Sequence, residues 1–413
     1  MANKSRIPAH PRNSRYGWTR RQFFQTSGVS AVTASALLTQ CSGGRALSGN
    51  VPTYDQLGVR PVVNAAGTYT IIGGSLVLPE VDAAMEAASH GYVHLDELME
   101  AIGARLAELT GAEWGLITSG CAAALCQVTA ACVAGSDPEK LARLPETTGM
   151  KNEVIAQKIH RHTYDHAIRQ VGVKIITVET RDELLAAISD RTAMFSVLGE
   201  REEDAQVSVK ELSKISKQYN IPILVDAAAE RPDIPNRYLE DGADIVAYSG
   251  GKCMRGPQCT GMVLGRKDIC QAAFLHGSPH HAIGRPMKVG KEEAMGLLAA
   301  VEAWILTRDH DAEWKEWENR LAHVESAVAD LPTITTDIAL PKRSNYTPIL
   351  EIGWDAATIQ ATASEISEIL YHGTPRIYLK TNKDKLRVNP YMMEPSDYLV
   401  VADNLRKVLQ SKI

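Results

Sequence analysis

Two short segments near the middle of the chain constrain its fold most strongly. The first is the apolar run Ile221 to Val225, which ends on Asp226, and the second leads into Ser249-Gly250-Gly251-Lys252. A strand that ends in aspartate, followed by a strand that leads into Ser-Gly-Gly-Lys, is the arrangement a protein would use to hold pyridoxal phosphate. The Lys252 amine would form a Schiff base with the aldehyde, while Asp226 would pair with the ring nitrogen and keep it protonated. Taken singly, the lysine is also compatible with a surface loop and the aspartate with a helix cap.

Strand-like and helix-like stretches alternate along the chain. We predict strands over residues 114–118, 153–157, 174–178, 193–198, 221–225, 245–248 and 261–264. We predict helices over 79–88, 95–109, 122–134, 164–171, 181–188, 209–219, 292–308 and 313–331. Such alternation indicates an α/β fold with a mostly parallel central sheet covered by helices on both faces. Residues 348–413 alternate again, with a helix over 358–370, and predict a smaller C-terminal α/β domain.

Composition limits the class of protein. The chain has 413 residues, of which 45% are hydrophobic and 23% charged, with a net charge of −5. These values are ordinary for a globular protein and allow two to three domains. The negative charge argues against a dedicated nucleic-acid surface, which is usually basic. We expect residues 51–310 to form a large cofactor domain with an N-terminal arm, and residues 311–413 to form the small domain.

The first fifty residues differ from the rest. They contain several Lys and Arg residues, no acid before Asp55, and the pair Arg20-Arg21 ahead of a mild apolar stretch. This pattern predicts a Tat export signal over residues 1–50 and hence a periplasmic protein; the alternative is a disordered basic tail. Cys41 lies in a sequence similar to a lipobox. Lipid attachment at Cys41 and simple cleavage near Ala46 both remain open.

The other cysteines do not indicate a metal site. All six lie in apolar or glycine-rich segments without the spacing of metal ligands: Cys121, Cys126, Cys132, Cys253, Cys259 and Cys270. We therefore expect no metal cofactor, and we expect the cysteines to be small buried side chains.

A predicted strand, turn and helix start coincide at Thr118-Ser119-Gly120-Cys121. Free N–H groups at a helix start bind phosphate, the two hydroxyls add donors, and the glycine allows close approach. We predict that these four residues hold the cofactor phosphate, with a further hydrogen bond from Ser249. The alternative is an ordinary helix capped by serine.

Four further residues are candidates around the cofactor and substrate. His160, or its neighbour His162, is expected to cover one face of the cofactor ring, and Arg161 to bind an anionic group. Arg387 is expected to bind a substrate carboxylate through its guanidinium group; structural pairing with an acid is the alternative. Arg285 is a further candidate to bind a phosphate or the substrate, either in its own subunit or across a subunit boundary.

Several motifs resemble one known group of enzymes. They include Asn64-Ala65-Ala66-Gly67-Thr68, Leu109-Thr110-Gly111-Ala112-Glu113, Thr118-Ser119-Gly120, Ser249-Gly250-Gly251-Lys252 and Arg387-Val388-Asn389-Pro390. Over roughly residues 54 to 410 the chain resembles selenocysteine synthase-like enzymes of fold type I, the aspartate aminotransferase-like pyridoxal phosphate fold. Within this group it is most similar to the D-glucosaminate-6-phosphate ammonia-lyase type. The resemblance implies Lys252 as the Schiff-base lysine, Asp226 as the partner of the ring nitrogen, and a homodimer or higher homo-oligomer.

From these observations we predict a pyridoxal phosphate-dependent lyase. It would act on a small amino substrate, an amino acid or amino sugar acid, by α,β-elimination. A racemase and a selenium-transferase-like transferase are the enzymatic alternatives, because all three reactions begin by forming a carbanion at the α-carbon. An exported binding protein built on a retired pyridoxal phosphate fold is the alternative of another class. An intact Lys252 and Asp226 argue against it.

Overall fold

The computed structural model of the protein describes residues 51–413. The predicted export signal and Cys41 lie outside the described residues. Residues 51–60 belong to a separate unit and contain one 3-10 turn, Asp55–Leu57. The unit from residue 61 onward contains two hydrophobic cores, one under a large sheet and one under a smaller sheet. The domain boundary predicted at residue 310 stays a prediction.

A seven-stranded sheet organises the larger part of this unit. Its strand order is β2-β8-β7-β6-β5-β3-β4, and β8 alone runs antiparallel to its two neighbours. The strands are β2 (Trp114–Thr118), β3 (Glu153–Gln157), β4 (Lys174–Val178), β5 (Thr192–Leu198), β6 (Ile223–Asp226), β7 (Ile245–Ser249) and β8 (Gly261–Gly265). Except in the edge strand β4, whose residues are mostly exposed or half-buried, these nearly continuous apolar runs are buried on both faces, as a parallel sheet between helices requires. The predicted fold class is confirmed.

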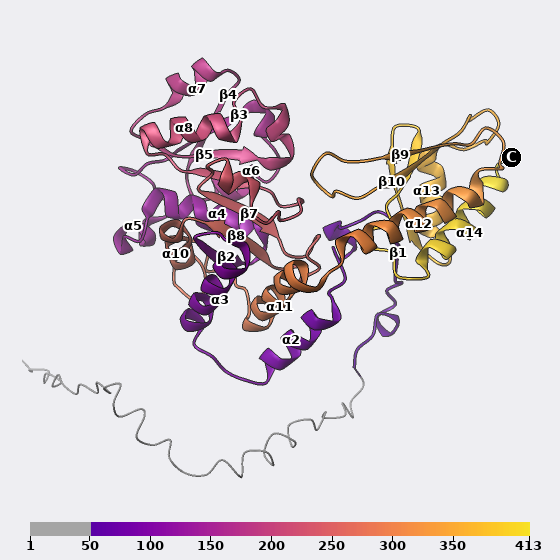
Figure 1. Ribbon diagram of the computed structural model, residues 1–413, viewed down its shortest axis with the longest axis horizontal. Helices are drawn as coiled ribbons and strands as arrows, with labels where there is room; N and C mark the ends of the chain where they lie inside the picture. Colours follow the sequence, from indigo (N-terminus) through magenta and orange to yellow (C-terminus); the bar gives the residue numbers. More distant parts are fainter. Residues whose placement is uncertain (1–50) are drawn as a thin grey trace, which may run out of the picture. The chain divides into compact units, whose positions relative to one another are not determined.

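Helices cover this sheet (Figure 1). They are α3 (Leu95–Thr110), α4 (Gly120–Ala134), α5 (Pro138–Arg143), α6 (Asp165–Arg169), α7 (Arg181–Ala187), α8 (Val209–Tyr219), α9 (Arg237–Glu240), α10 (Lys267–Leu275) and α11 (Lys291–Glu302), while α2 (Pro79–Ser89) packs against α11. α4 is buried along almost its whole length and packs on α10, β7 and β8. Its alanines and cysteines permit this close approach, because small side chains let a helix lie near the sheet.

The register of the sheet brings the ends of several strands together. Asp226 lies opposite Leu198 of β5 and Ala247 of β7, and Thr118 lies opposite Gly261. Since β5, β6 and β7 are parallel, their carboxyl ends share one edge of the sheet. Ligands of open α/β sheets bind at this edge.

The smaller part is built on an antiparallel sheet of order β12-β13-β10-β9. Its strands are β9 (Thr335–Ala339), β10 (Ile349–Gly353), β12 (Lys380–Asn382) and β13 (Lys385–Val388). A parallel pair, β1 (Val63–Asn64) with β11 (Ile377–Tyr378), connects the start of the unit to it. The helices are α12 (His310–Val328), α13 (Ala363–His372) and α14 (Asp397–Gln410), and a π-helical turn, Ala303–Thr307, follows α11.

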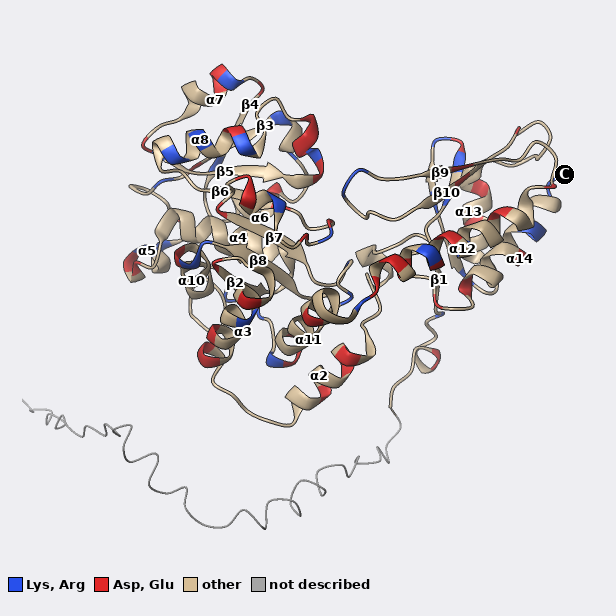
Figure 2. Ribbon diagram, in the orientation of Figure 1, with Lys and Arg blue, Asp and Glu red and all other residues tan. Residues whose placement is uncertain are grey.

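Three general properties hold for residues 51–413. Acidic and basic side chains are interspersed over the helices (Figure 2). No helix in this range has both the length and the apolar character needed to cross a bilayer. Its six cysteines are free thiols.

Candidate active site

Asp226 is a buried carboxylate at the end of β6. Its Oδ1 accepts hydrogen bonds from Ala228 N at 3.0 Å and from Cys121 Sγ at 3.5 Å. Its Oδ2 lies 3.8 Å from His162 Nε2. Burial raises the pKa of Asp226, while the Ala228 N–H and the His162 imidazole act in the opposite direction. The carboxylate is thus held in one orientation, with Oδ2 left for a cationic partner.

Cys121 connects Asp226 to the start of α4. Burial, followed by the nearby Asp226 charge, raises the pKa of the Cys121 thiol well above its usual value. The sulfur therefore stays a neutral S–H and donates to the carboxylate. Cys121 is one of the four residues predicted to hold the phosphate; the structure places its side chain at Asp226.

The turn before α4 has the shape of an anion site. Gly120 has a φ of +82°, and a Cβ built there would meet no atom within 4 Å. Ser119 precedes the helix without using its side chain as a cap, and Thr118 Oγ1 donates to the Gly120 carbonyl at 2.9 Å. The helix start therefore presents free N–H groups and one uncommitted hydroxyl to open space.

Gly261 of β8 supports this turn from behind. A Cβ on Gly261 would lie 2.5 Å from the Gly120 carbonyl carbon, so any side chain there must displace the turn. We expect Gly261→Ala to weaken cofactor binding by roughly tenfold or more. Titration of the apoprotein with pyridoxal phosphate, followed by absorbance, measures this change. The matched control is Gly91→Ala, where a Cβ meets no atom within 4 Å. Equal affinity in the two variants would contradict a phosphate site at Gly120.

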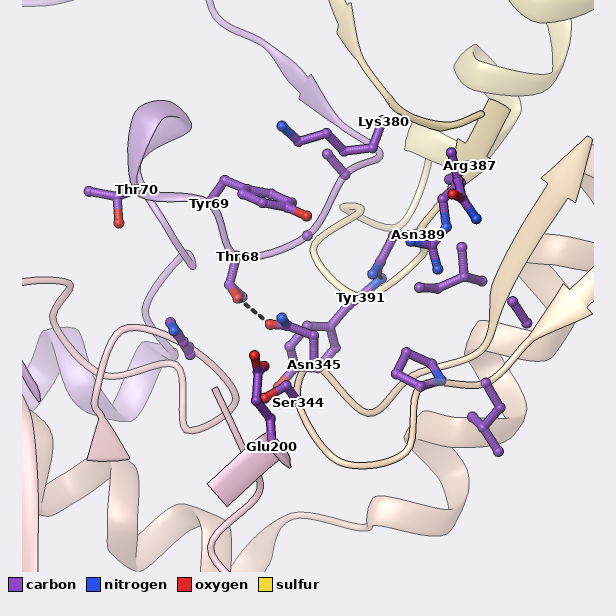
Figure 3. Close-up of a pocket in the computed structure, with 18 of the residues that line it drawn as sticks. Thr68, Tyr69, Thr70, Glu200, Ser344, Asn345, Lys380, Arg387, Asn389 and Tyr391 are labelled. Carbon is purple, nitrogen blue, oxygen red and sulfur yellow. Dashed lines mark hydrogen bonds between the residues drawn. The ribbon is translucent and has the colours of Figure 1, made fainter. Parts of the chain in front are cut away.

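Lys252 is among the residues that line a cavity of about 780 Å³. Figure 3 shows this cavity. The cavity is lined by Ala66, Gly67, Thr68, Tyr69, Thr70, Ile71, Tyr164, Glu200, Lys252, Ala339, Leu340, Pro341, Ser344, Asn345, Ile349, Glu351, Lys380, Asn382, Arg387, Asn389 and Tyr391. Hydroxyl, amide and charged groups face it from segments that follow strands of the large sheet and from the strands and loops of the small sheet. Its volume suits a small-molecule ligand, and its polar lining suits a polar one.

Arg387 of β13 is among the residues that line this cavity. Its Nε lies 3.3 Å from Glu351 Oε1, and Lys385 Nζ lies 3.4 Å from Glu351 Oε2. One carboxylate thus faces two cations. Lys380 Nζ is stacked 4.4 Å from the centroid of the Tyr69 ring. This wall of the cavity carries excess positive charge, which suits an anionic group of a substrate.

Two predicted residues are committed to contacts outside the cavity lining. His160 is buried, its Nε2 lies 3.4 Å from Gln157 Nε2, and burial lowers its pKa to about 4. The structure places His162, its alternative, beside Asp226. Arg161 donates to Asp165 Oδ2 at 2.5 Å. Which of these residues contacts the cofactor stays a prediction.

The other two predicted residues have these positions. Ser249 ends β7, and its N–H donates to the Ala228 carbonyl at 3.2 Å. Arg285 is exposed, and its Nη1 lies 3.4 Å from Ser278 Oγ. Neither side chain lines the cavity at Lys252.

Sequence reasoning missed several side chains of the cavity. Glu200 follows β5, Asn345 lies between β9 and β10, and Tyr391 follows β13. Thr68 Oγ1 donates to Asn345 Oδ1 at 3.1 Å, a bond drawn in Figure 3. Thr68 lies in a motif that was already recognisable, but nothing local marks Glu200 or Asn345 as site residues.

The residues present fit pyridoxal phosphate. The open N-terminus of α4 suits a phosphate group. Among the described residues, the His162 imidazole is the one ion-pairing group within 4 Å of the buried Asp226 carboxylate. A protonated ring nitrogen would supply the missing positive charge. Lys252, on the cavity wall, supplies the amine that the aldehyde requires.

Comparisons with known proteins agree with this fit. A family model described as aminotransferase class-V matches residues 81–284. The 5'-C-glycyluridine monooxygenase-decarboxylase of Streptomyces sp is 32% identical over 374 residues, covering 86% of this chain and 92% of that protein. D-glucosaminate-6-phosphate ammonia lyase of Salmonella typhimurium is 29% identical, covering 86% and 98%. A solved structure of D-glucosaminate-6-phosphate ammonia-lyase has a TM-score of 0.78 at 28% identity, covering 88% of this chain and 100% of that chain.

The two relatives and the solved structure each match over at least 86% of the chain, and together with the family model they confirm both the cofactor and the resemblance predicted from the motifs. The chain belongs to the same family as its 32% identical relative, it has the fold of the fold type I enzymes, and its cofactor is pyridoxal phosphate.

Proposed function

We propose that this enzyme is a lyase that removes the β-substituent of an amino acid or amino sugar acid by α,β-elimination. The observation that carries the proposal is a polar cavity lined by both Lys252 and Arg387. The similarity to an ammonia lyase over most of both chains supports the reaction class. We further propose that the protein is exported by its Tat-type N-terminus and works as a homo-oligomer.

When bound, pyridoxal phosphate accepts the electron pair released at the substrate α-carbon. Asp226 would hold a proton on the ring nitrogen, because a buried carboxylate needs a positive partner. Lys252 would remove the α-proton as a general base. The N–H groups at the start of α4 and the Ser119 hydroxyl would bind the phosphate. Arg387 would bind the substrate carboxylate, with Glu351 holding its guanidinium group in place.

Product analysis tests the proposed reaction. Purified enzyme loaded with cofactor is incubated in deuterated water with a panel of amino acids and amino sugar acids. We expect release of a keto acid and ammonia in equal amounts from at least one of them. Deuterium uptake at the α-carbon without keto acid would instead favour the racemase. A colourless protein that ignores added cofactor would favour the binding protein.

One relative supports a second candidate reaction. The 32% identical protein is named a monooxygenase-decarboxylase, which differs in chemistry from an ammonia lyase. The same incubations therefore include measurement of carbon dioxide release and oxygen consumption. If both accompany turnover, while ammonia and keto acid do not appear, the lyase proposal is wrong.

A further inference from the structure

One wall of the cavity is a loop of the small domain, residues 340–348, which joins β9 to β10. Leu340, Pro341, Ser344 and Asn345 of this loop line the cavity. The two residues between them are not among the lining residues and form ion pairs with the large domain. These residues are Lys342 and Arg343. We call residues 340–348 the β9–β10 loop.

Arg343 forms the more buried of these ion pairs. Its Nε donates to Glu230 Oε2 at 2.6 Å, and its Nη2 lies 3.4 Å from Asp233 Oδ2. The side chain of Arg343 is 15% exposed and that of Glu230 is 1% exposed. The guanidinium carbon also lies 5.3 Å from the centroid of the Tyr238 ring. The contact therefore excludes most solvent, unlike an ordinary surface ion pair.

Glu230 belongs to the turn that follows Asp226. Its N–H donates to the Ala227 carbonyl at 2.9 Å, and the N–H of Ala228, two residues earlier, donates to Asp226 Oδ1. The loop contacts this turn a second time, because Asn345 N donates to the Ala229 carbonyl at 2.7 Å. The loop that lines the cavity is thus attached to the segment that carries the predicted partner of the cofactor ring.

The β9–β10 loop supplies the positive charge that pairs with the buried Glu230 carboxylate. Tyr238 donates its hydroxyl to both oxygens of Glu230, at 2.9 and 3.0 Å. Among the described residues, Arg343 is the one cation within 4 Å of this carboxylate, since Arg237 pairs with Glu202. Moving the loop away would leave a buried carboxylate with a hydroxyl alone, which is strongly unfavourable. The closed position of the loop is therefore favoured by the large domain.

We propose that Arg343 is a positioning residue, which holds the β9–β10 loop against the turn after Asp226 and so completes the substrate pocket. The choice of turnover as one readout rests on the proposed function. Arg343 acts through Glu230 and does not line the cavity itself. Its loss opens one wall of the pocket and leaves the predicted cofactor contacts at Ser119, Asp226 and Lys252 in place.

The test compares Arg343→Ala with Lys342→Ala in the full chain loaded with cofactor. Lys342 is the neighbour of Arg343 in the loop and pairs with Asp204 at 2.9 Å, but these side chains are 63% and 39% exposed. We expect Arg343→Ala to raise KM by about tenfold or more, with little change in kcat or in the visible cofactor band. We expect Lys342→Ala to stay within about twofold of the native KM.

Hydrogen exchange supplies a readout that does not need a substrate. Peptides from residues 340–348 and 227–230 should exchange faster in Arg343→Ala and unchanged in Lys342→Ala. Arg343→Lys should restore part of the protection, because the lysine ammonium group can reach one carboxylate but lacks the planar guanidinium group that contacts both carboxylates. Native-like exchange in Arg343→Ala would overturn the proposal whether or not the lyase reaction has been found.

A double-mutant cycle separates positioning from general stability. Glu230→Gln removes the buried charge and keeps an acceptor for Tyr238. The rise in KM and in hydrogen exchange caused by Arg343→Ala should therefore be much smaller in this background than in the native one. If Arg343→Ala alone does not fold, the double variant, which lacks the unpaired buried charge, can still be used to measure KM and hydrogen exchange. Equal effects of Arg343→Ala in both backgrounds, or loss of the cofactor band in Arg343→Ala, would contradict the proposed role.

Discussion

Replacing Lys252 by alanine is expected to lower turnover by at least about 10²–10⁴-fold, the range contributed by a single general acid or base. The loss should be larger still if the same amine also binds the cofactor covalently. The variant should fold normally, because Lys252 lines the cavity and is not part of either hydrophobic core. Steady-state release of keto acid measures the loss.

The covalent role of Lys252 has its own measurement. Borohydride treatment of the native holoprotein, followed by proteolysis and mass spectrometry, should place the cofactor on the peptide that contains Lys252. The control is Lys217→Ala, an exposed lysine at the end of α8, which should keep both activity and labelling. Labelling of another lysine in the native protein would contradict the proposed site and the mechanism built on it.

Replacing Asp226 by asparagine is expected to have opposite effects on activity and on the stability of the apoprotein. Activity should fall by about 10²–10³-fold, because the variant cannot hold a positive charge on the ring nitrogen. The apoprotein should become more stable, because asparagine keeps an acceptor for Ala228 N without burying a charge. Sites that bind a charged ligand often carry such a cost to stability.

The pH dependence of this stability follows from the direction of the pKa shift. Burial raises the pKa of Asp226 in the folded apoprotein above its unfolded value. The folded state therefore binds the proton more tightly, and this contribution to stability is present below the unfolded pKa and lost as pH rises through the folded pKa. Asp226→Asn should raise Tm by about 2 °C or more at pH 8, and the gain should shrink as the pH is lowered toward 4.

Calorimetry of the two apoproteins across this range tests the prediction. Asp190→Asn, a change at an exposed loop residue, is the control and should leave Tm nearly constant relative to the native chain. A gain from Asp226→Asn that grows as the pH falls would mean that Asp226 is stabilised as a carboxylate in the apoprotein. The proposed need for a cationic partner would then be wrong.

Local patterns predicted the buried elements of the large domain closely. The predicted bounds of β2, β3 and α8 agree with the structure, because continuous apolar runs and helical periodicity mark buried segments directly; those of the more exposed edge strand β4 agree as well. A helix predicted over 358–370 starts later, at Ala363. Thr362 and Glu365 form a capping box at the start of this helix. The prediction followed the helical periodicity further upstream and did not use this local start signal.

Other elements left no local pattern. β9 (Thr335–Ala339) is half exposed and lies at the edge of its sheet, so its sequence lacks the alternation of a buried strand. It forms because each of its residues, Thr335 to Ala339, pairs with a residue of β10 in the antiparallel ladder. Its position matters for the site, since the β9–β10 loop begins where this strand ends.

The sequence by itself determined the cofactor and the fold class, and it named the candidate residues for the cofactor. Strands, turns and helix starts such as those at Asp226, Lys252 and Gly120 are specified by neighbouring residues, so they can be recognised without the fold. The tertiary structure alone decided which residues line the candidate cavity. Thr68 meets Asn345 across 277 positions and Arg343 meets Glu230 across 113 positions. Such contacts depend on how two cores are joined and where a loop crosses between them, and no local periodicity encodes that path.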